Sequence, residues 1–509
     1  MAKGKRDKDK GKGHKSPVPS AAATNGKVAS PATPATPATP AQPASGHRPP
    51  GQRFYDLPYS AAAPRLINPD LGLHNLVARA GHNAAYSIDV TLLDAPDHRL
   101  IRSGVLLAHR VLDGRGEWYL TAPDWQPLLP KDRIELMGHA DLPEELADLL
   151  RPLRRRATLG PVAALTCDRR EFALRDDHGT TLALLRDDKV TVRRGGLTTA
   201  RYREVMITPV GPGITDEQTA WLDRAFIQSG ATYVPKFPRL VTRLGAPATG
   251  PTDLPVPEPF DADASFKKFV SQLLALRLRR IVEADLAIRG GDLTAIGRLA
   301  DEAARLRDEL KGLSPVLDAE WVEDVYDELG WISLDSAPSD ADGRERLSTR
   351  LRSERYLTVL ERLVGAVRAP KLAEVRAEAT GVVLTELVAS AVDRLRQAAD
   401  ALTVDSPEEE WDEAWREIGR LQWVLDVAAQ VLPEDSARIR RRLSAAARLL
   451  AEVHDDRTSE ATAMMLVADL TPELAFLAGR DFERETDKAR RSRRHFVREW
   501  AKIVKKLDA

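Results

Sequence analysis

The chain has 509 residues, with 75 Lys and Arg against 76 Asp and Glu, so its formal net charge at pH 7 is −1. This balance excludes a uniformly basic nucleic-acid binder but leaves room for local charged patches. Apolar residues make up 43% of the chain, which is enough for a sizeable core, and the length fits two or three domains. The single cysteine, Cys167, excludes a disulfide framework and a cysteine-based zinc site, and it fits a reducing compartment.

The composition of residues 1–57 predicts a disordered, basic tail rich in proline and alanine. Residues 1–15 carry seven Lys or Arg, and proline recurs at every third position over about residues 30–44. Such a segment is an extended tether, because proline disfavours helix and the small residues offer little to bury. It is either a solvated tail or a flexible basic arm that binds a polyanion through its charges. The polyanion could also be nucleic acid, bound without sequence specificity. We expect no secretory signal, no transmembrane helix, no membrane partner and a cytoplasmic location.

From residue 58 to 244 the sequence changes to short segments in which apolar and polar residues alternate. This alternation is typical of half-buried strands. The expected strands cover residues 86–96, 104–112, 116–123, 162–177, 180–194 and 202–210. A hairpin turn is expected near Asp176, and helices are expected at 142–153 and 216–230. Many strands with few helices predict an α+β domain built on an antiparallel sheet or β-barrel.

Residues 245–264 predict a linker, because they are acidic and rich in Pro and Gly. From residue 265 to 509 the chain shows apolar residues at helical spacing, with Arg, Glu and Asp on the other faces. This pattern predicts an all-α bundle of antiparallel helices. A weak twofold repeat is visible, since long helices near residues 291 and 408 each follow an acidic segment.

Several segments of residues 85–243 resemble the CYTH family, which has the triphosphate tunnel fold. The resemblance lies in VTLLDAPDHRLIRSGVLLAHR, in LTCDRREFALRDDHGTTLALLRDDKVTV, in YREVMITPV and in GATYVPKFPRL, which occur in the family's order. It implies a tunnel in which Arg and Lys bind a polyphosphate and carboxylates hold a divalent metal.

Many of the implied tunnel residues are replaced in this sequence. No Glu-x-Glu-x-Lys strand occurs between residues 51 and 95, and Ala108, Thr121 and Met206 stand where the family has charged side chains. The candidates that stay for anion binding are Arg110, Arg170 or its neighbour Arg169, Lys189 and Lys236. Glu204 stays as a weak candidate metal ligand. Without the other carboxylates, metal-assisted phosphoryl chemistry loses its electrostatic support, so we predict no catalytic residues and a degenerate domain.

The helical half resembles a CHAD domain, which is built from two helical repeats. This resemblance implies a polyphosphate-binding protein. The resemblance lies in residues 278–310, in SERYLTVLERL, in residues 408–432 and in LLAEVHDD. Here too implied cations are missing, because Gly297, Asp412 and Gly419 occupy their positions. Arg305, Arg307 and Arg420 stay as candidates for anion binding.

Two further basic clusters lie near the C-terminus. One contains Arg438, Arg441 and Arg442. The other contains Arg490, Arg494 and Arg498, which with Lys502 would line one stripe of a helix while Phe496, Trp500 and Ile503 cover another. Each cluster is either a solvated helix face or a phosphate-chain or nucleic-acid stripe.

These observations predict a multidomain protein in which a degenerate CYTH-like β-barrel precedes a CHAD-like bundle. The predicted function is a non-enzymatic binding or scaffold protein for inorganic polyphosphate or another polyanion, with a possible place at polyphosphate granules. No cofactor is expected. Two alternatives stay open. One is a triphosphatase or polyphosphatase that uses Mg²⁺ or Mn²⁺ at an atypical site. The other is a nucleoid-associated or protein-interaction module.

Overall fold

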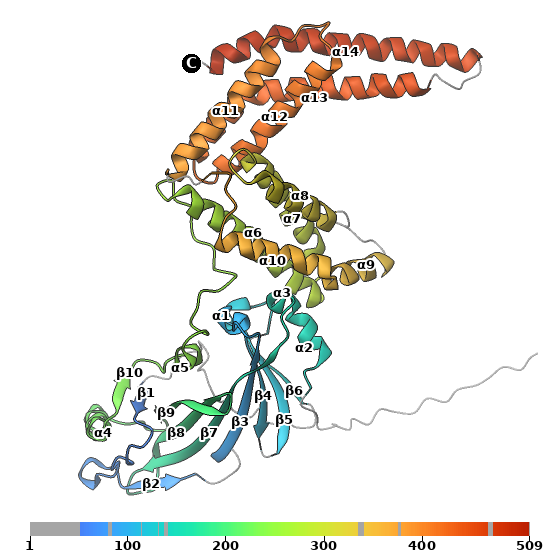
Figure 1. Cartoon of the computed structure of the whole chain (residues 1–509). Coiled ribbons are helices and arrows are strands. Elements are labelled where there is room, and N and C mark those ends of the chain that lie inside the picture. The colour runs from blue at the N-terminus through green and yellow to red at the C-terminus, as the bar shows by residue number, and fades with distance from the viewer. Residues whose placement is uncertain are drawn as a thin grey trace, which may run out of the picture. The chain divides into compact units, whose positions relative to one another are not determined.

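The computed structural model describes residues 51–79, 84–112, 114–130, 132–136, 141–333, 341–374, 378–466 and 472–507 (Figure 1). Residues 1–50, most of the predicted tail, lie outside these ranges. Within them the protein has an antiparallel sheet followed by helices, which confirms the predicted fold class. Among the described residues, no helix is both long and apolar enough to cross a membrane.

The strands form one antiparallel sheet in the order β10-β1-β9-β8-β7-β3-β4-β5-β6, with β2 paired to β7. The six predicted strands correspond to β3 (Ala85–Asp94), β4 (Leu106–Leu112), β5 (Arg115–Thr121), β7 (Gly160–Arg175), β8 (Thr181–Arg194) and β9 (Leu197–Pro209). The sequence did not predict the strands β1 (Arg53–Leu57), β2 (Asn75–Ala78), β6 (Asp132–Leu136) and β10 (Thr232–Val234). Because β1 pairs with β9 and β10, the sheet begins before residue 58.

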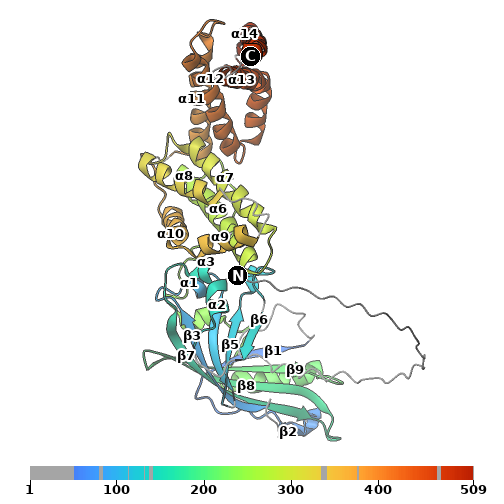
Figure 2. The same ribbon diagram turned by 90° about the vertical axis from the view of Figure 1, so that its right-hand side faces the viewer.

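The three longest strands, β7, β8 and β9, run side by side through the middle of the sheet, as Figure 2 also shows. The β7–β8 turn lies at the predicted place, where the Asp176 carboxylate accepts the Thr180 N–H at 2.7 Å. Successive side chains along β7 point to opposite faces. We call the face that carries Leu165 and Cys167 the inner face, and the face that carries Thr166 and Asp168 the outer face.

Two helices cover parts of this sheet. On the outer face, α4 (Asp216–Gln228) packs Leu222 and Phe226 against the strands, and Phe226 stacks on Tyr55 at 4.1 Å between ring centroids. On the inner face, α5 (Leu240–Leu244) packs Leu240 and Leu244 against the sheet. Short helical segments connect the other strands. They are η1 (Pro69–Leu71), α1 (Arg99–Arg102), η2 (Pro123–Trp125), α2 (Glu144–Leu149) and α3 (Arg151–Arg154).

The predicted linker is an ordered and partly buried segment. Asp253, with a side chain only 1% exposed, accepts Arg155 at 2.5 Å and also pairs with Arg102 and Arg368. Arg102 and Arg155 belong to the sheet half, whereas Arg368 belongs to the helical half. One hydrophobic cluster also contains residues of both halves, such as Trp125 and Phe266. The segment 245–264 therefore packs against both halves, and the two halves share a core.

The helical half begins with α6 (Phe266–Arg289) and α7 (Ala295–Leu313). It continues with α8 (Ala319–Ser333), α9 (Ala341–Arg352), α10 (Glu354–Arg368), α11 (Thr380–Asp400), α12 (Glu408–Ala428), α13 (Pro433–Leu466) and α14 (Pro472–Leu507). Figure 1 shows α13 and α14 as two long helices that lie side by side.

The weak twofold repeat has a structural counterpart in one pair of charges. Arg277 of α6 donates to Glu302 of α7 at 2.9 Å, and Arg394 of α11 donates to Glu417 of α12 at 3.3 Å. The partners are 25 residues apart in the first pair and 23 in the second. The same link between consecutive helices thus occurs in both parts of the bundle.

The two parts of the bundle meet where α7 packs on α12. A Cβ atom added at Gly312 would lie 2.7 Å from the carbonyl oxygen of Trp423 and 2.8 Å from its carbonyl carbon. Real Cβ atoms do not approach backbone this closely. Only glycine therefore permits this contact between the two helix backbones.

Candidate functional site

A row of polar side chains crosses the inner face of the sheet. The strand registers place Tyr86, Arg169, Asp188, Glu204 and Asp56 opposite one another on β3, β7, β8, β9 and β1. Residues that are directly opposite in neighbouring strands project from the same face of a sheet. The row therefore places three carboxylates and one guanidinium side by side on one face of the sheet.

The charges in this row are already paired within the protein. Arg169 donates to both oxygens of Asp188, at 2.7 and 2.9 Å, and its side chain is only 2% exposed. Arg243 of α5 extends onto the row and donates to Asp56 at 2.8 Å and to Glu204 at 3.2 Å. Each carboxylate thus has an arginine partner, and each arginine has a carboxylate partner.

A second buried pair lies on the same face nearer the other edge of the sheet. Arg110 of β4 forms an ion pair with Glu117 of β5, and both side chains are largely buried. The Arg110 guanidinium also lies 4.2 Å from the ring centroid of Tyr119. Arg110 therefore does not present a free charge to a ligand.

Between these charged positions the inner face is apolar. Ala108, Tyr119, Leu165, Cys167 and Val190 pack together with α5 in one buried cluster. Burial raises the pKa of the Cys167 thiol to about 12, so the thiol stays neutral. Between its ion pairs the inner face is therefore filled with hydrocarbon, which binds no phosphate.

Glu204, the candidate metal ligand, lies in a partly buried position. Burial raises its pKa to about 7, while Arg243 acts in the opposite direction. Its neighbours Asp56 and Asp188 are held by arginines. In the part of the chain that the structure describes, no group of three or more His, Cys, Asp or Glu is arranged to hold a metal ion. These residues do not fit the divalent metal that the resemblance implies, and we derive no catalytic step through one.

The sequence analysis did not name Tyr86, Asp188, Arg243 or Asp56 as site residues. Among these, Asp56 was placed outside the domain altogether. It lies on β1, a strand of five residues that directly follows the proline-rich tail and was assigned to it. The available signal was the alternation in RFYDL, where Phe54 and Asp56 share one face and Tyr55 and Leu57 share the other. Arg243, which lies on a helix outside the strands, gave no such signal.

The other CYTH-like candidates do not share a face with Arg110. Arg170 and Lys189 follow the inward-facing Arg169 and Asp188, so they lie on the outer face. Arg170 is exposed, and the Lys189 ammonium lies 5.9 Å from the ring centroid of Tyr59. Lys236 is exposed in the segment after β10. The structure therefore does not bring Arg110, Arg170, Lys189 and Lys236 together.

The CHAD-like candidates are also dispersed. Arg305 is exposed on α7, and Arg307 packs its guanidinium 4.1 Å from the ring centroid of Tyr326. Arg420 of α12 forms an ion pair with Glu417, which also accepts Arg394. Arg307 and Arg420 therefore have partners within the protein, whereas Arg305 points to solvent.

The first basic cluster lies on the N-terminal part of α13. Arg438 pairs with Asp435 at 2.6 Å, one turn before it. Arg441 is exposed and Arg442 is half-buried, and neither forms an ion pair within the described ranges. This cluster thus provides two cations without carboxylate partners.

The second basic cluster lies on α14, and its helix has the predicted two-sided character. Phe496, Trp500 and Ile503 are buried in the bundle, with Phe496 stacked on Trp500 at 5.6 Å. The cations face outward. We call the exposed Arg490, Arg494, Arg498 and Lys502 the α14 ridge.

The α14 ridge differs from the inner face of the sheet in how its charges are paired. Arg498 and Lys502 share one acid, Glu499, at 3.3 and 3.0 Å. Arg490 and Arg494 form no ion pair with any residue that the structure describes. At i, i+4 spacing these cations follow one another at about 6 Å along the helix. The ridge is therefore a row of solvent-facing charge with a surplus of cations.

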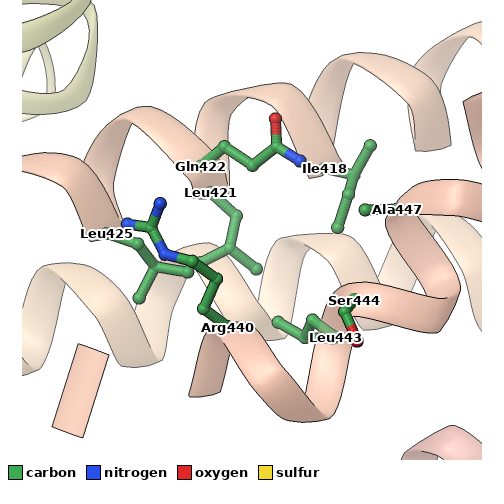
Figure 3. A pocket seen from close by; sticks show the side chains of 8 residues that line it. All are labelled: Ile418, Leu421, Gln422, Leu425, Arg440, Leu443, Ser444 and Ala447. Carbon is green, nitrogen blue, oxygen red and sulfur yellow. The ribbon is translucent and has the colours of Figure 1, made fainter. Parts of the chain in front are cut away.

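A shallow cavity of about 260 Å³ lies between α12 and α13 (Figure 3). Its walls are mainly apolar, with Leu421, Leu425 and Leu443 among the lining residues, and Arg440 stands at its side. Because Arg440 donates to Asp426 at 2.8 Å, this cavity does not offer a free cation to an anion.

No family model matches the sequence, and no curated protein matches it. Among solved structures, PptA from Streptomyces chartreusis is 17% identical, with a TM-score of 0.34, over 47% of this chain and 100% of that one. The CHAD domain from the plant Ricinus communis is 15% identical, with a TM-score of 0.30, over 47% of this chain and 95% of that one.

A third solved structure is HpAC1 from Hippeastrum, which is described by a dominant triphosphatase activity. It is 12% identical, with a TM-score of 0.18, over 36% of this chain and 88% of that one.

Proposed function

We propose that this protein is a non-enzymatic binding or scaffold protein for inorganic polyphosphate or a similar polyanion. One observation carries the proposal. The inward-facing arginines of the sheet are each paired with a carboxylate, whereas Arg490 and Arg494 of the α14 ridge face solvent and pair with no carboxylate that the structure describes. An extended chain of phosphates is attracted by a row of unpaired cations, and its affinity falls as salt rises.

The sheet half acts in this proposal as a structural domain. Its carboxylates are held by Arg169 and Arg243, and its inner face is packed with apolar side chains. A metal-dependent triphosphatase would need those carboxylates free for the metal. The location that accompanies the proposal is the cytoplasm, at polyphosphate granules, and the single cysteine fits a reducing compartment.

The direct test measures the binding of labelled long-chain polyphosphate to the full chain at several salt concentrations. We expect binding that weakens steeply with salt, and we expect Arg490→Glu/Arg494→Glu to weaken it at least tenfold. The logarithmic salt slope should become shallower by about 0.7 for each phosphate contact that is lost. Charge reversal of Arg441 and Arg442 should produce a smaller loss.

A matched control lies on the same helix. Arg480→Glu/Arg484→Glu changes the charge of α14 by the same amount, outside the ridge, and should leave polyphosphate binding within about twofold of the wild type. Equal losses in both double variants, or no binding at low salt, would contradict the proposal. Phosphate release from tripolyphosphate that requires Mg²⁺ or Mn²⁺ and disappears in Glu204→Gln would establish an enzyme instead.

A further inference from the structure

The segment around α3 is the most concentrated run of arginine in the sheet half. Its sequence, RPLRRR, places arginine at positions 151, 154, 155 and 156. Two of these have carboxylate partners. Arg155 pairs with Asp253 and Glu361, and Arg156 donates to Glu354 at 2.9 Å. Among the described residues, the side chains of the other two, Arg151 and Arg154, donate to backbone carbonyl oxygens and to no carboxylate.

Arg151 contacts the helical half at the junction of α9 and α10. Its Nη2 donates to the carbonyl oxygen of Arg352 at 2.9 Å. Its Nε is buried and has no hydrogen-bond partner within the described part of the chain. The Nε of Arg155 is in the same state although Arg155 is ion-paired, so what distinguishes Arg151 is the missing carboxylate partner.

Arg154 lies one turn further along and donates to the carbonyl oxygens of Ala147 and Ala157, at 3.3 and 3.2 Å. Burial lowers its pKa, and the nearby charges of Arg151 and Arg289 lower it further. The two cations near Arg154 therefore outweigh the one nearby carboxylate, Asp148, which acts in the opposite direction on its pKa.

Asp148 does not relieve this excess because it is already shared. It accepts Arg289 at 2.9 Å and Arg352 at 3.0 Å, and Arg289 also donates to Asp285 at 2.8 Å. The other acids at this place are Glu354, which Arg156 occupies, and Glu144, which acts on Arg352. After these pairings, no described carboxylate forms an ion pair with Arg151 or Arg154, where α3 meets the α9–α10 junction.

We propose that Arg151 and Arg154 form an anion site that binds a phosphate-type oxyanion between the sheet half and the helical half. Both side chains are half-buried, so an ion can reach them from solvent. Two arginine forks one helical turn apart suit the several acceptor oxygens of a phosphate group. Because Arg151 also contacts the helical half through Arg352, binding there stabilises the contact between the halves. This site is distinct from the α14 ridge.

The test measures the melting temperature of the full chain in sodium phosphate and in sodium chloride of equal ionic strength, with calorimetric titration of phosphate. We expect phosphate to raise the melting temperature more than chloride does, as linkage requires for a ligand of the folded state. Arg151→Gln and Arg151→Gln/Arg154→Gln should weaken phosphate binding at least tenfold. The single variant gives up only one carbonyl contact, so it keeps the test valid if the double variant does not fold.

Arg156→Gln is the matched control, since it removes a neighbouring arginine whose charge is already paired with Glu354. It should retain phosphate binding, as should Arg490→Gln/Arg494→Gln, which separates this site from the proposed function. If tripolyphosphate displaces phosphate, the site binds the terminal phosphate groups of a polyphosphate chain. If phosphate binds and tripolyphosphate does not displace it, the site binds the free phosphate ion. An equal effect of phosphate and chloride on the wild type, or unchanged phosphate binding in Arg151→Gln/Arg154→Gln, would overturn the proposal.

Discussion

The inner face of the sheet and the α14 ridge both carry several cations, yet they use them in opposite ways. On the inner face Arg110, Arg169 and Arg243 are buried or half-buried, and each has a carboxylate partner. On the ridge Arg490 and Arg494 are exposed, and neither forms an ion pair with a described residue. The number of cations is similar, but only the second set is available to a ligand.

This difference shows that the partner of a charge, more than the charge itself, decides its role. A buried guanidinium requires a carboxylate because a charge without one is strongly destabilised in a medium of low polarity. Once that pair forms, the arginine contributes to the fold and no longer attracts phosphate. An exposed arginine has no such requirement, because water solvates it. The predictions below test this contrast.

Removing one member of a buried pair should have the largest effect on stability. Arg169→Met leaves Asp188 with Arg186, 3.1 Å away, as its remaining partner. Breaking a buried pair costs about 3–5 kcal/mol, and we expect the lower end of that range because of Arg186. Urea unfolding of the variant and the wild type measures the difference. A loss below about 1 kcal/mol would show that the inner-face pairs do not stabilise the sheet.

The raised pKa of Glu204 predicts a dependence of stability on pH. Its ordinary value is 4.5 and its value in the folded protein is about 7, so the folded state holds this proton more tightly. Between pH 4.5 and 7 the folded state binds more protons than the unfolded state, and stability falls as pH rises. The contribution is up to about 3 kcal/mol.

Glu204→Gln removes this titrating group while it keeps the size of the side chain. The difference in unfolding free energy between the variant and the wild type should therefore change between pH 5 and pH 7.5, in favour of the variant at the higher pH. Asp94, whose burial also raises its pKa, titrates in both proteins and cancels in the difference. A difference that is constant over this range would disprove the assignment.

Gly312→Ala should destabilise the bundle where α7 meets α12. The new methyl group would lie 2.7 Å from the backbone of Trp423, so the helices have to separate. Such overpacking costs about 1–3 kcal/mol. Gly297→Ala is the control on the same helix, because its Cβ would meet no atom within 4 Å. Thermal unfolding should show a loss for the first variant, and for the second a gain of up to about 1 kcal/mol from helix propensity.

The smallest effect on stability is expected at the α14 ridge. Arg490→Gln/Arg494→Gln removes two exposed charges without ion-pair partners, so the unfolding free energy should stay within about 0.5 kcal/mol of the wild type. Urea unfolding, compared directly with that of Arg169→Met, measures this contrast. A loss as large as that of Arg169→Met would mean that the ridge has a structural role that its exposure does not indicate.

Much of the architecture followed from periodicity in the sequence. The alternation in residues 162–177 and 180–194 predicted β7 and β8, and the apolar spacing after residue 489 predicted which face of α14 is buried. The prediction missed β1 because five residues beside a proline-rich segment carry little periodic signal. It also treated residues 245–264 as a linker, since their composition does not reveal that Asp253 is buried among three arginines.

The sequence by itself determined that this chain has a strand-rich half and a helical half, and that motif positions of both resembled families are replaced. Local patterns suffice for this, because strand and helix periods are properties of neighbouring residues. Only the tertiary structure decided which cations are paired. Arg243 and Glu204 are 39 residues apart, and Arg155 and Asp253 are 98 apart. Such partners meet through folding alone, which is why the charge balance of 75 against 76 does not reveal where free positive charge lies.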